Sequence, residues 1–90
     1  MIMWNHGLLT VGETIGEAFA RMHRLADCCE AQAELMMTGS EIRRVPDEVC
    51  EFTQQQLAKR AQGSNRPPDG ELEWKMYRRL AEKLDPSYRT

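Results

Sequence analysis

Residues 14–38 decide the fold, and they read TIGEAFARMHRLADCCEAQAELMMT. Thr14 is a favoured N-cap residue, and Glu17 three positions later completes a capping box. Gly39 is suited to the left-handed position that ends a helix. Apolar residues recur between these signals in alternating steps of four and three, which is typical of one face of a helix: Ile15, Phe19, Met22, Ala26, Cys29, Ala33 and Met36. The stretch therefore predicts a long helix over residues 14–38.

Two shorter helices are predicted downstream. Pro46 suits the first turn of a helix, and Asp47 and Glu48 favour its positive end, so one helix is expected over residues 46–62. A Gly- and Pro-rich linker is expected over residues 63–70. A helix over residues 71–84 then carries an apolar stripe in steps of four, made by Leu72, Met76, Leu80 and Leu84. The fold class is thus mainly α.

The first residues predict a short β-hairpin, or an extended segment if the hairpin needs a neighbouring sheet. Asn5-His6-Gly7 is a turn signal, because Asn and Gly tolerate positive φ, and it lies between the β-prone runs 2–4 and 8–11. We expect a single partial domain over residues 1–90. Its parts are a hairpin segment 1–12, a helical pair 13–62, the linker 63–70 and a C-terminal helix and tail 71–90.

Composition and length indicate which classes of partner and which location to expect. The 90 residues carry a formal net charge of −2, which argues against nucleic acid. No apolar run approaches the roughly 20 residues that cross a bilayer, so no membrane partner is expected. No secretory signal is evident, and three cysteines do not indicate a disulfide framework, so a cytoplasmic location is expected. A chain this short buries little surface alone. We expect a homo-oligomer, with the face from Ile15 to Met36 packed against another helix or another copy.

Few residues are candidates for chemistry. His6 lies in the hairpin turn, where a neutral imidazole can bind zinc, and the alternative is an exposed turn histidine. His23 is expected to point to solvent, with Asp27 as a surface contact at the i+4 position. Cys28 and Cys29 diverge by about 100° on a helix, so they are expected to be small buried residues. No Ser/His/Asp set or Gly-rich phosphate loop is evident, so no catalytic or cofactor-binding residue is assigned.

Three segments resemble one known family. Residues 4–19, WNHGLLTVGETIGEAF, are similar to the Asn-His-Gly segment of the class II aldolase/adducin family. Residues 26–32 resemble the helix that follows in that family, and residues 84–88, LDPSY, resemble the end of many bacterial aldolase-like members. The resemblance implies the C-terminal part of the α/β class II aldolase fold. It also implies that His6 corresponds to the last ligand of a divalent metal, usually zinc, which polarises the oxygens of a sugar-phosphate-like substrate.

The resemblance also sets a limit on activity. The family's other two metal ligands form a His-x-His pair upstream of this segment, together with the catalytic acid and the phosphate-binding loops. The only histidines here are His6 and His23, whereas a catalytic zinc needs about three protein ligands. We therefore expect a truncated family member without activity or stoichiometric zinc by itself, self-associating through its helices. The alternative is a zinc-dependent aldolase-type lyase or epimerase acting on a sugar phosphate, with its remaining site residues supplied by sequence absent here.

Overall fold

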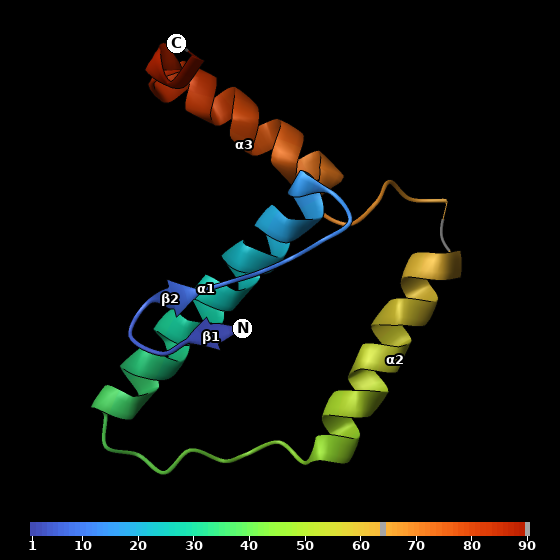
Figure 1. Cartoon of the computed structure of the whole chain (residues 1–90). Coiled ribbons are helices and arrows are strands. Elements are labelled where there is room, and N and C mark those ends of the chain that lie inside the picture. The colour runs from blue at the N-terminus through green and yellow to red at the C-terminus, as the bar shows by residue number, and fades with distance from the viewer. Residues whose placement is uncertain (64, 90) are drawn as a thin grey trace. The chain divides into compact units, whose positions relative to one another are not determined.

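The computed structural model describes residues 1–63 and 65–89 (Figure 1). Ser64, in the expected linker, and Thr90, at the end of the expected tail, lie outside the described residues. The chain divides into two compact units, residues 1–26 with 67–90, and residues 27–66. Within the described residues, the secondary structure is mainly helical, as expected from the sequence, with a short antiparallel pair of strands at the start. None of the described helices has the length and apolar character needed to span a bilayer.

The predicted hairpin is confirmed in the first unit. Strand β1 (Ile2–Met3) pairs antiparallel with strand β2 (Gly7–Leu8). One further pair of contacts extends it, because the Leu9 amide donates to the Met1 carbonyl at 2.9 Å and the Met1 ammonium donates to the Leu9 carbonyl at 2.8 Å. The paired region is therefore shorter than the β-prone run 8–11 of the sequence.

Helix α1 (Ile15–Met37) matches the predicted bounds within one residue at each end. The Glu17 amide donates to Thr14 Oγ1 at 3.1 Å, which is the N-cap bond expected from the sequence. The reciprocal bond is displaced by one residue, because Glu17 Oε2 accepts from the Glu13 amide at 2.7 Å. Gly39, with φ 72°, takes the left-handed conformation after the helix.

Helix α3 (Glu71–Leu84) has the bounds that the sequence predicts. It begins after Gly70, whose φ is 81°, and a short 3₁₀ helix η1 (Pro86–Arg89) follows it. The 3₁₀ helix was not predicted. The Asp85 carboxylate accepts from the Ser87 amide at 3.0 Å, and this local bond turns the chain where proline prevents the helix from continuing.

Helix α2 (Asp47–Gly63) belongs to the second unit and lies within one residue of the predicted range. The Pro46 carbonyl accepts from the amides of Val49 at 3.0 Å and Cys50 at 3.3 Å, so Pro46 lies just before the helix and not in its first turn, where it was predicted. None of the helix's described residues is buried.

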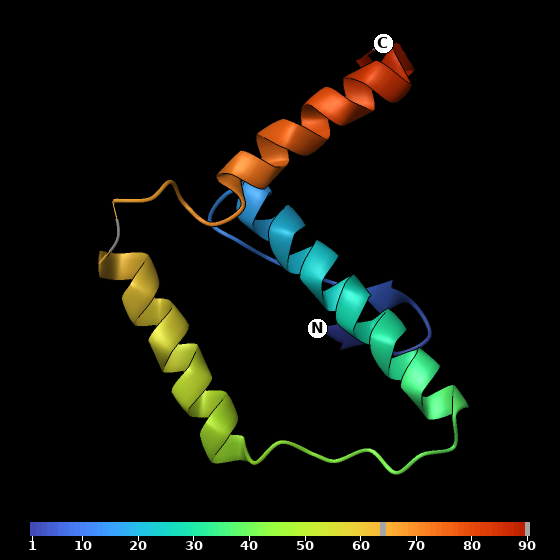
Figure 2. The ribbon, with the colours of Figure 1, turned by 180° about the vertical axis from the view of Figure 1, so that it is seen from behind.

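The core of the first unit lies where α1 meets the start of α3. Gly16, Ala20 and Gly70 are its buried residues, and α3 starts beside the N-terminal end of α1 (Figures 1 and 2). A Cβ added to Gly16 would lie 3.0 Å from the Gly70 carbonyl oxygen and 3.2 Å from Trp74 Cβ. Two glycines therefore allow the backbones to touch, as small residues do at close helix contacts.

The predicted apolar face of α1 is confirmed only in part. Phe19, which belongs to that face, is half-buried and contacts Trp74 and Tyr77 with ring centroids 5.3 and 5.2 Å apart. Ile15 and Met36 are exposed in the single chain. The glycine contact determines where α3 touches α1, so the buried positions lie to one side of the predicted face. Packing of the exposed ends against another copy stays a prediction.

Candidate functional site

His6 lies exposed in the hairpin turn, and one of its ring nitrogens is held by the backbone. Its Nδ1 lies 3.0 Å from the Trp4 carbonyl oxygen. A carbonyl oxygen only accepts hydrogen bonds, so in the neutral ring Nδ1 carries the hydrogen and donates it. The lone pair then belongs to Nε2. Metal-binding histidines commonly fix their tautomer and ring orientation in this way, by donating the other N–H to a backbone carbonyl.

The turn sequence explains how the imidazole is presented. Asn5 has φ 55° and Gly7 has φ 131°, so the residues on both sides of His6 adopt left-handed conformations that asparagine and glycine tolerate best. The His6 amide donates to the Met3 carbonyl at 3.4 Å, which closes the turn. A β-branched residue at position 7 would be strained whatever the space around it.

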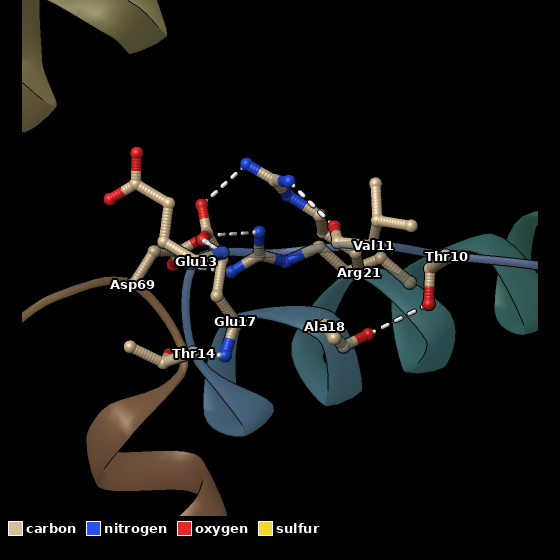
Figure 3. A network of polar contacts seen from close by, with 9 residues as sticks. Thr10, Val11, Glu13, Thr14, Glu17, Ala18, Arg21 and Asp69 are labelled. Carbon is tan, nitrogen blue, oxygen red and sulfur yellow. Dashed lines mark hydrogen bonds and ion pairs between the residues drawn. The ribbon is translucent and has the colours of Figure 1, made fainter.

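Polar contacts hold the segment between the hairpin and α1 (Figure 3). We call the residues that make these contacts the clasp: Thr10, Val11, Glu13, Glu17, Ala18 and Arg21. Thr10 Oγ1 donates to the Ala18 carbonyl at 2.9 Å. Arg21 donates through Nη1 to the Val11 carbonyl at 2.7 Å and forms an ion pair with Glu17 through Nη2. The Glu17–Arg21 pair was expected from its i, i+4 spacing, whereas the contacts to Thr10 and Val11 have no sequence signal.

A second polar contact links α1 with the residue that precedes Gly70. Arg24 donates to both carboxylate oxygens of Asp69 at 2.9 Å each. This hydrogen bonding lowers the pKa of Asp69 below its usual value, opposed by partial desolvation and aided by the charges of Arg24 and Arg21. The same contact raises the pKa of Arg24. Sequence analysis missed the pair, because its members are 45 residues apart and one lies in a linker.

His23 differs from the expectation that it points only to solvent. Its side chain is exposed, yet Nε2 lies 2.9 Å from the Tyr77 hydroxyl and the two rings meet edge to face. Phe19 also approaches it, with centroids 6.3 Å apart. The start of α3 meets α1 at Gly16, and this contact brings Tyr77 alongside His23. The sequence held no signal for this crossing, because Tyr77 lies beside the apolar stripe of α3 and not on it.

The expectation of buried cysteines also needs correction. Cys28 and Cys50 are exposed and Cys29 is half-buried, and all three are free thiols. The cysteines therefore supply neither core packing nor a disulfide.

The described residues do not bring a complete metal site together around His6. Among residues 1–63 and 65–89, no three His, Cys, Asp or Glu side chains lie close enough together to hold a metal ion. The orientation of His6 fits one ligand of such an ion, with Nδ1 held and Nε2 available. The described chain therefore presents one imidazole from a structured turn.

Comparisons with known proteins point to one family. Residues 1–33, which include the hairpin and much of α1, match the profile of the Class II Aldolase and Adducin N-terminal domain. The chain is 30% identical over 89 residues to the protein named Putative aldolase class 2 protein in Pseudomonas aeruginosa, an alignment that covers 99% of this chain and 34% of that protein. It is 33% identical over 97 residues to alpha-adducin of Rattus norvegicus and of Mus musculus, covering 100% of this chain and 13% of each.

The chain thus spans about a third of the length of the bacterial relative and a smaller share of the adducins. No solved structure matches it. The matched region contains His6 and the clasp, and its descriptions name both aldolases and adducins.

Proposed function

The chain belongs to the class II aldolase/adducin family, and from this premise we propose that His6 supplies one ligand of a divalent-metal site that other polypeptide sequence completes. The observation that supports the proposal is the hydrogen bond from Nδ1 to the Trp4 carbonyl, which leaves Nε2 as the donor atom. Zinc is the metal expected in the family, and imidazole is one of its preferred ligands.

By itself the chain is proposed to be without catalytic activity. A catalytic zinc site has about three protein ligands, and the described residues bring no such group together. When the site is completed by further ligands, the bound metal supplies Lewis-acid polarisation of substrate oxygens. In that assembly the proposed activity is that of an aldolase-type lyase or an epimerase acting on a sugar phosphate, with His6 holding the metal.

A specific observation favours self-association as a second function. The apolar stripe of α3 is exposed along its whole length, at 62% for Leu72, 53% for Met76, 46% for Leu80 and 76% for Leu84. An exposed row of this kind on a short chain favours burial against a partner. We propose that copies of the chain associate through this stripe.

The cellular location is a separate proposal. Three free thiols are typical of a protein in a reducing compartment, and we propose that the chain is cytoplasmic.

Equilibrium dialysis of the full chain against zinc tests the metal proposal. Wild type is expected to bind zinc weakly through His6, without forming a stoichiometric complex by itself, and His6→Ala is expected to lose that weak binding. His23→Ala serves as the matched control, because it removes the other imidazole of the chain, and it should bind as wild type does. Equal binding by wild type and His6→Ala would refute the proposal.

A further inference from the structure

We propose that Thr10 and Arg21 are positioning residues for His6, and that the clasp holds the connection between β2 and α1 against the first turns of α1 and so orients the hairpin. The inference rests on the proposed role of His6 as a metal ligand. His6 would share the metal with ligands from other sequence, so a fixed position of its side chain would raise the metal affinity. Loss of the contacts that orient a metal ligand commonly lowers the affinity for the metal 10- to 100-fold. The short connection between β2 and α1 makes contacts with α1 that can fix the hairpin in this way.

Thr10 makes the first attachment. It is half-buried and lies two residues after the end of β2, and its hydroxyl donates to the Ala18 carbonyl at 2.9 Å. That carbonyl belongs to a continuous helix, so the hydroxyl ties the end of the hairpin to a rigid element. Thr10 lies only four positions after His6, and the antiparallel pairing of Gly7 and Leu8 with β1 constrains part of that stretch.

Arg21 makes the second attachment and binds two groups at once. Its guanidinium donates to the Val11 carbonyl at 2.7 Å and to the Glu17 carboxylate. The other oxygen of that carboxylate accepts from the Glu13 amide at 2.7 Å. The planar fork of an arginine suits this bridging, whereas a lysine ammonium on a flexible stem does not reproduce it. The backbone on both sides of Gly12 is therefore attached to the same two side chains of α1.

Gly12 gives independent evidence that the connection lies flat against the helix. A Cβ added at this position would lie 2.7 Å from the Ala18 backbone nitrogen and 3.0 Å from Glu17 Cβ. The first of these contacts is with backbone, which cannot move aside without disturbing α1. In both ribbon views the connection runs back alongside the N-terminal part of α1 (Figures 1 and 2). Thr10, Gly12 and Arg21 thus make a close contact that leaves the hairpin little freedom.

The test measures the mobility of the hairpin in the full chain by ¹⁵N relaxation. In wild type the amides of residues 5–8 should have order parameters of about 0.85, the value of rigid backbone. In Arg21→Met these order parameters should fall below about 0.6, the range of flexible backbone. Thr10→Val, which removes the hydroxyl and keeps the shape, should lower them in the same direction. Arg24→Met is the matched control, because it removes an arginine of the same helix that bonds to Asp69 and not to the connection. Its order parameters should equal those of wild type.

A paramagnetic measurement separates this inference from the proposed function. Co²⁺ bound at His6 should give pseudocontact shifts at the amides of residues 18–21 in wild type, and these should decrease several-fold in Arg21→Met while far-ultraviolet circular dichroism shows unchanged helix. Lack of cobalt binding at His6 would refute the metal role alone, since the order parameters still report on the clasp. Equal order parameters for residues 5–8 in wild type, Arg21→Met and Thr10→Val would overturn the inference.

Discussion

The backbone of Gly70 touches the backbone of Gly16, and this contact fixes where α3 meets α1. A Cβ at position 70 would lie 2.7 Å from the Gly16 carbonyl carbon and 2.9 Å from Ala20 Cβ. The φ of Gly70 is 81°, a conformation that residues with a Cβ rarely adopt. Both the space and the backbone conformation therefore require glycine at this position.

Gly70→Ala is expected to destabilise the first unit. The left-handed conformation alone costs about 1–2 kcal/mol for a residue with a Cβ, and the overlap with Gly16 adds to that. Urea unfolding followed by circular dichroism measures the change in free energy. Gly39→Ala is the control, because Gly39 also has positive φ but a Cβ there would meet nothing within 4 Å. If the two variants lose equal stability, the contact with Gly16 contributes nothing.

The Arg24–Asp69 pair predicts a loss of stability in acid. The pKa of Asp69 is lowered in the folded chain, so the stabilisation is present above the unfolded carboxyl pKa of about 4 and disappears as the pH falls through the lower folded value. The side chains are 60% and 48% exposed, so solvent screening limits the contribution to about 0.5 kcal/mol.

Carboxyl NMR titration tests this pair directly. In wild type, Asp69 should titrate below the usual range for aspartate. In Arg24→Met its pKa should return toward that range, because its hydrogen-bond donor and neighbouring charge are removed. An unchanged Asp69 titration in that variant would show that the pair does not form in solution.

The hydrogen bond between His23 and Tyr77 predicts a small stabilisation across the α1–α3 contact. Tyr77→Phe removes the hydroxyl and keeps the ring that packs on Phe19. The free energy of unfolding should fall by about 0.5–1.5 kcal/mol, the range of a typical hydrogen bond. The ring current shifts of Phe19 should persist, since the rings still meet. Loss of those shifts would mean that the hydroxyl, and not ring packing, holds the helices together.

The exposed stripe of α3 predicts concentration-dependent association. Sedimentation equilibrium of wild type should show species heavier than the monomer at micromolar concentration. Replacing Met76 and Leu80 together by lysine should shift the chain to monomer, because two charges in the middle of the stripe would have to be buried. Arg78→Gln changes an exposed residue outside the stripe and should associate as wild type does. A folded wild-type monomer at these concentrations would contradict self-association.

The sequence predicted local structure well, for identifiable reasons. Thr14 caps the start of α1 and Gly39 follows its end in the left-handed conformation. In the turn Asn5-His6-Gly7, Asn5 and Gly7 adopt the positive φ values that the hairpin needs. These signals act between residues that are close in the chain. Helix bounds and the turn that holds His6 followed from them.

Contacts between distant residues could not be predicted in the same way. Gly70 reads in the sequence as part of a linker, and nothing local shows that it meets Gly16. The sequence predicted the ion pair of Arg21 with Glu17, which lies four residues before it on the helix. It did not predict the hydrogen bond from Arg21 to the Val11 carbonyl, because the path of the backbone at Val11 does not follow from helical periodicity. The apolar pattern of α1 likewise predicted an amphipathic face, but not that its smallest residues would form the contact.

A long-range ¹H–¹⁵N spectrum of the histidine rings during zinc addition tests the central claim most directly. In the zinc-free chain, the hydrogen of the neutral His6 ring is expected on Nδ1. Zinc is expected to shift the Nε2 resonance of His6 and to leave the resonances of both ring nitrogens of His23 unchanged. A His6 ring protonated on Nε2 before zinc is added, or a zinc-induced shift confined to His23, would contradict it.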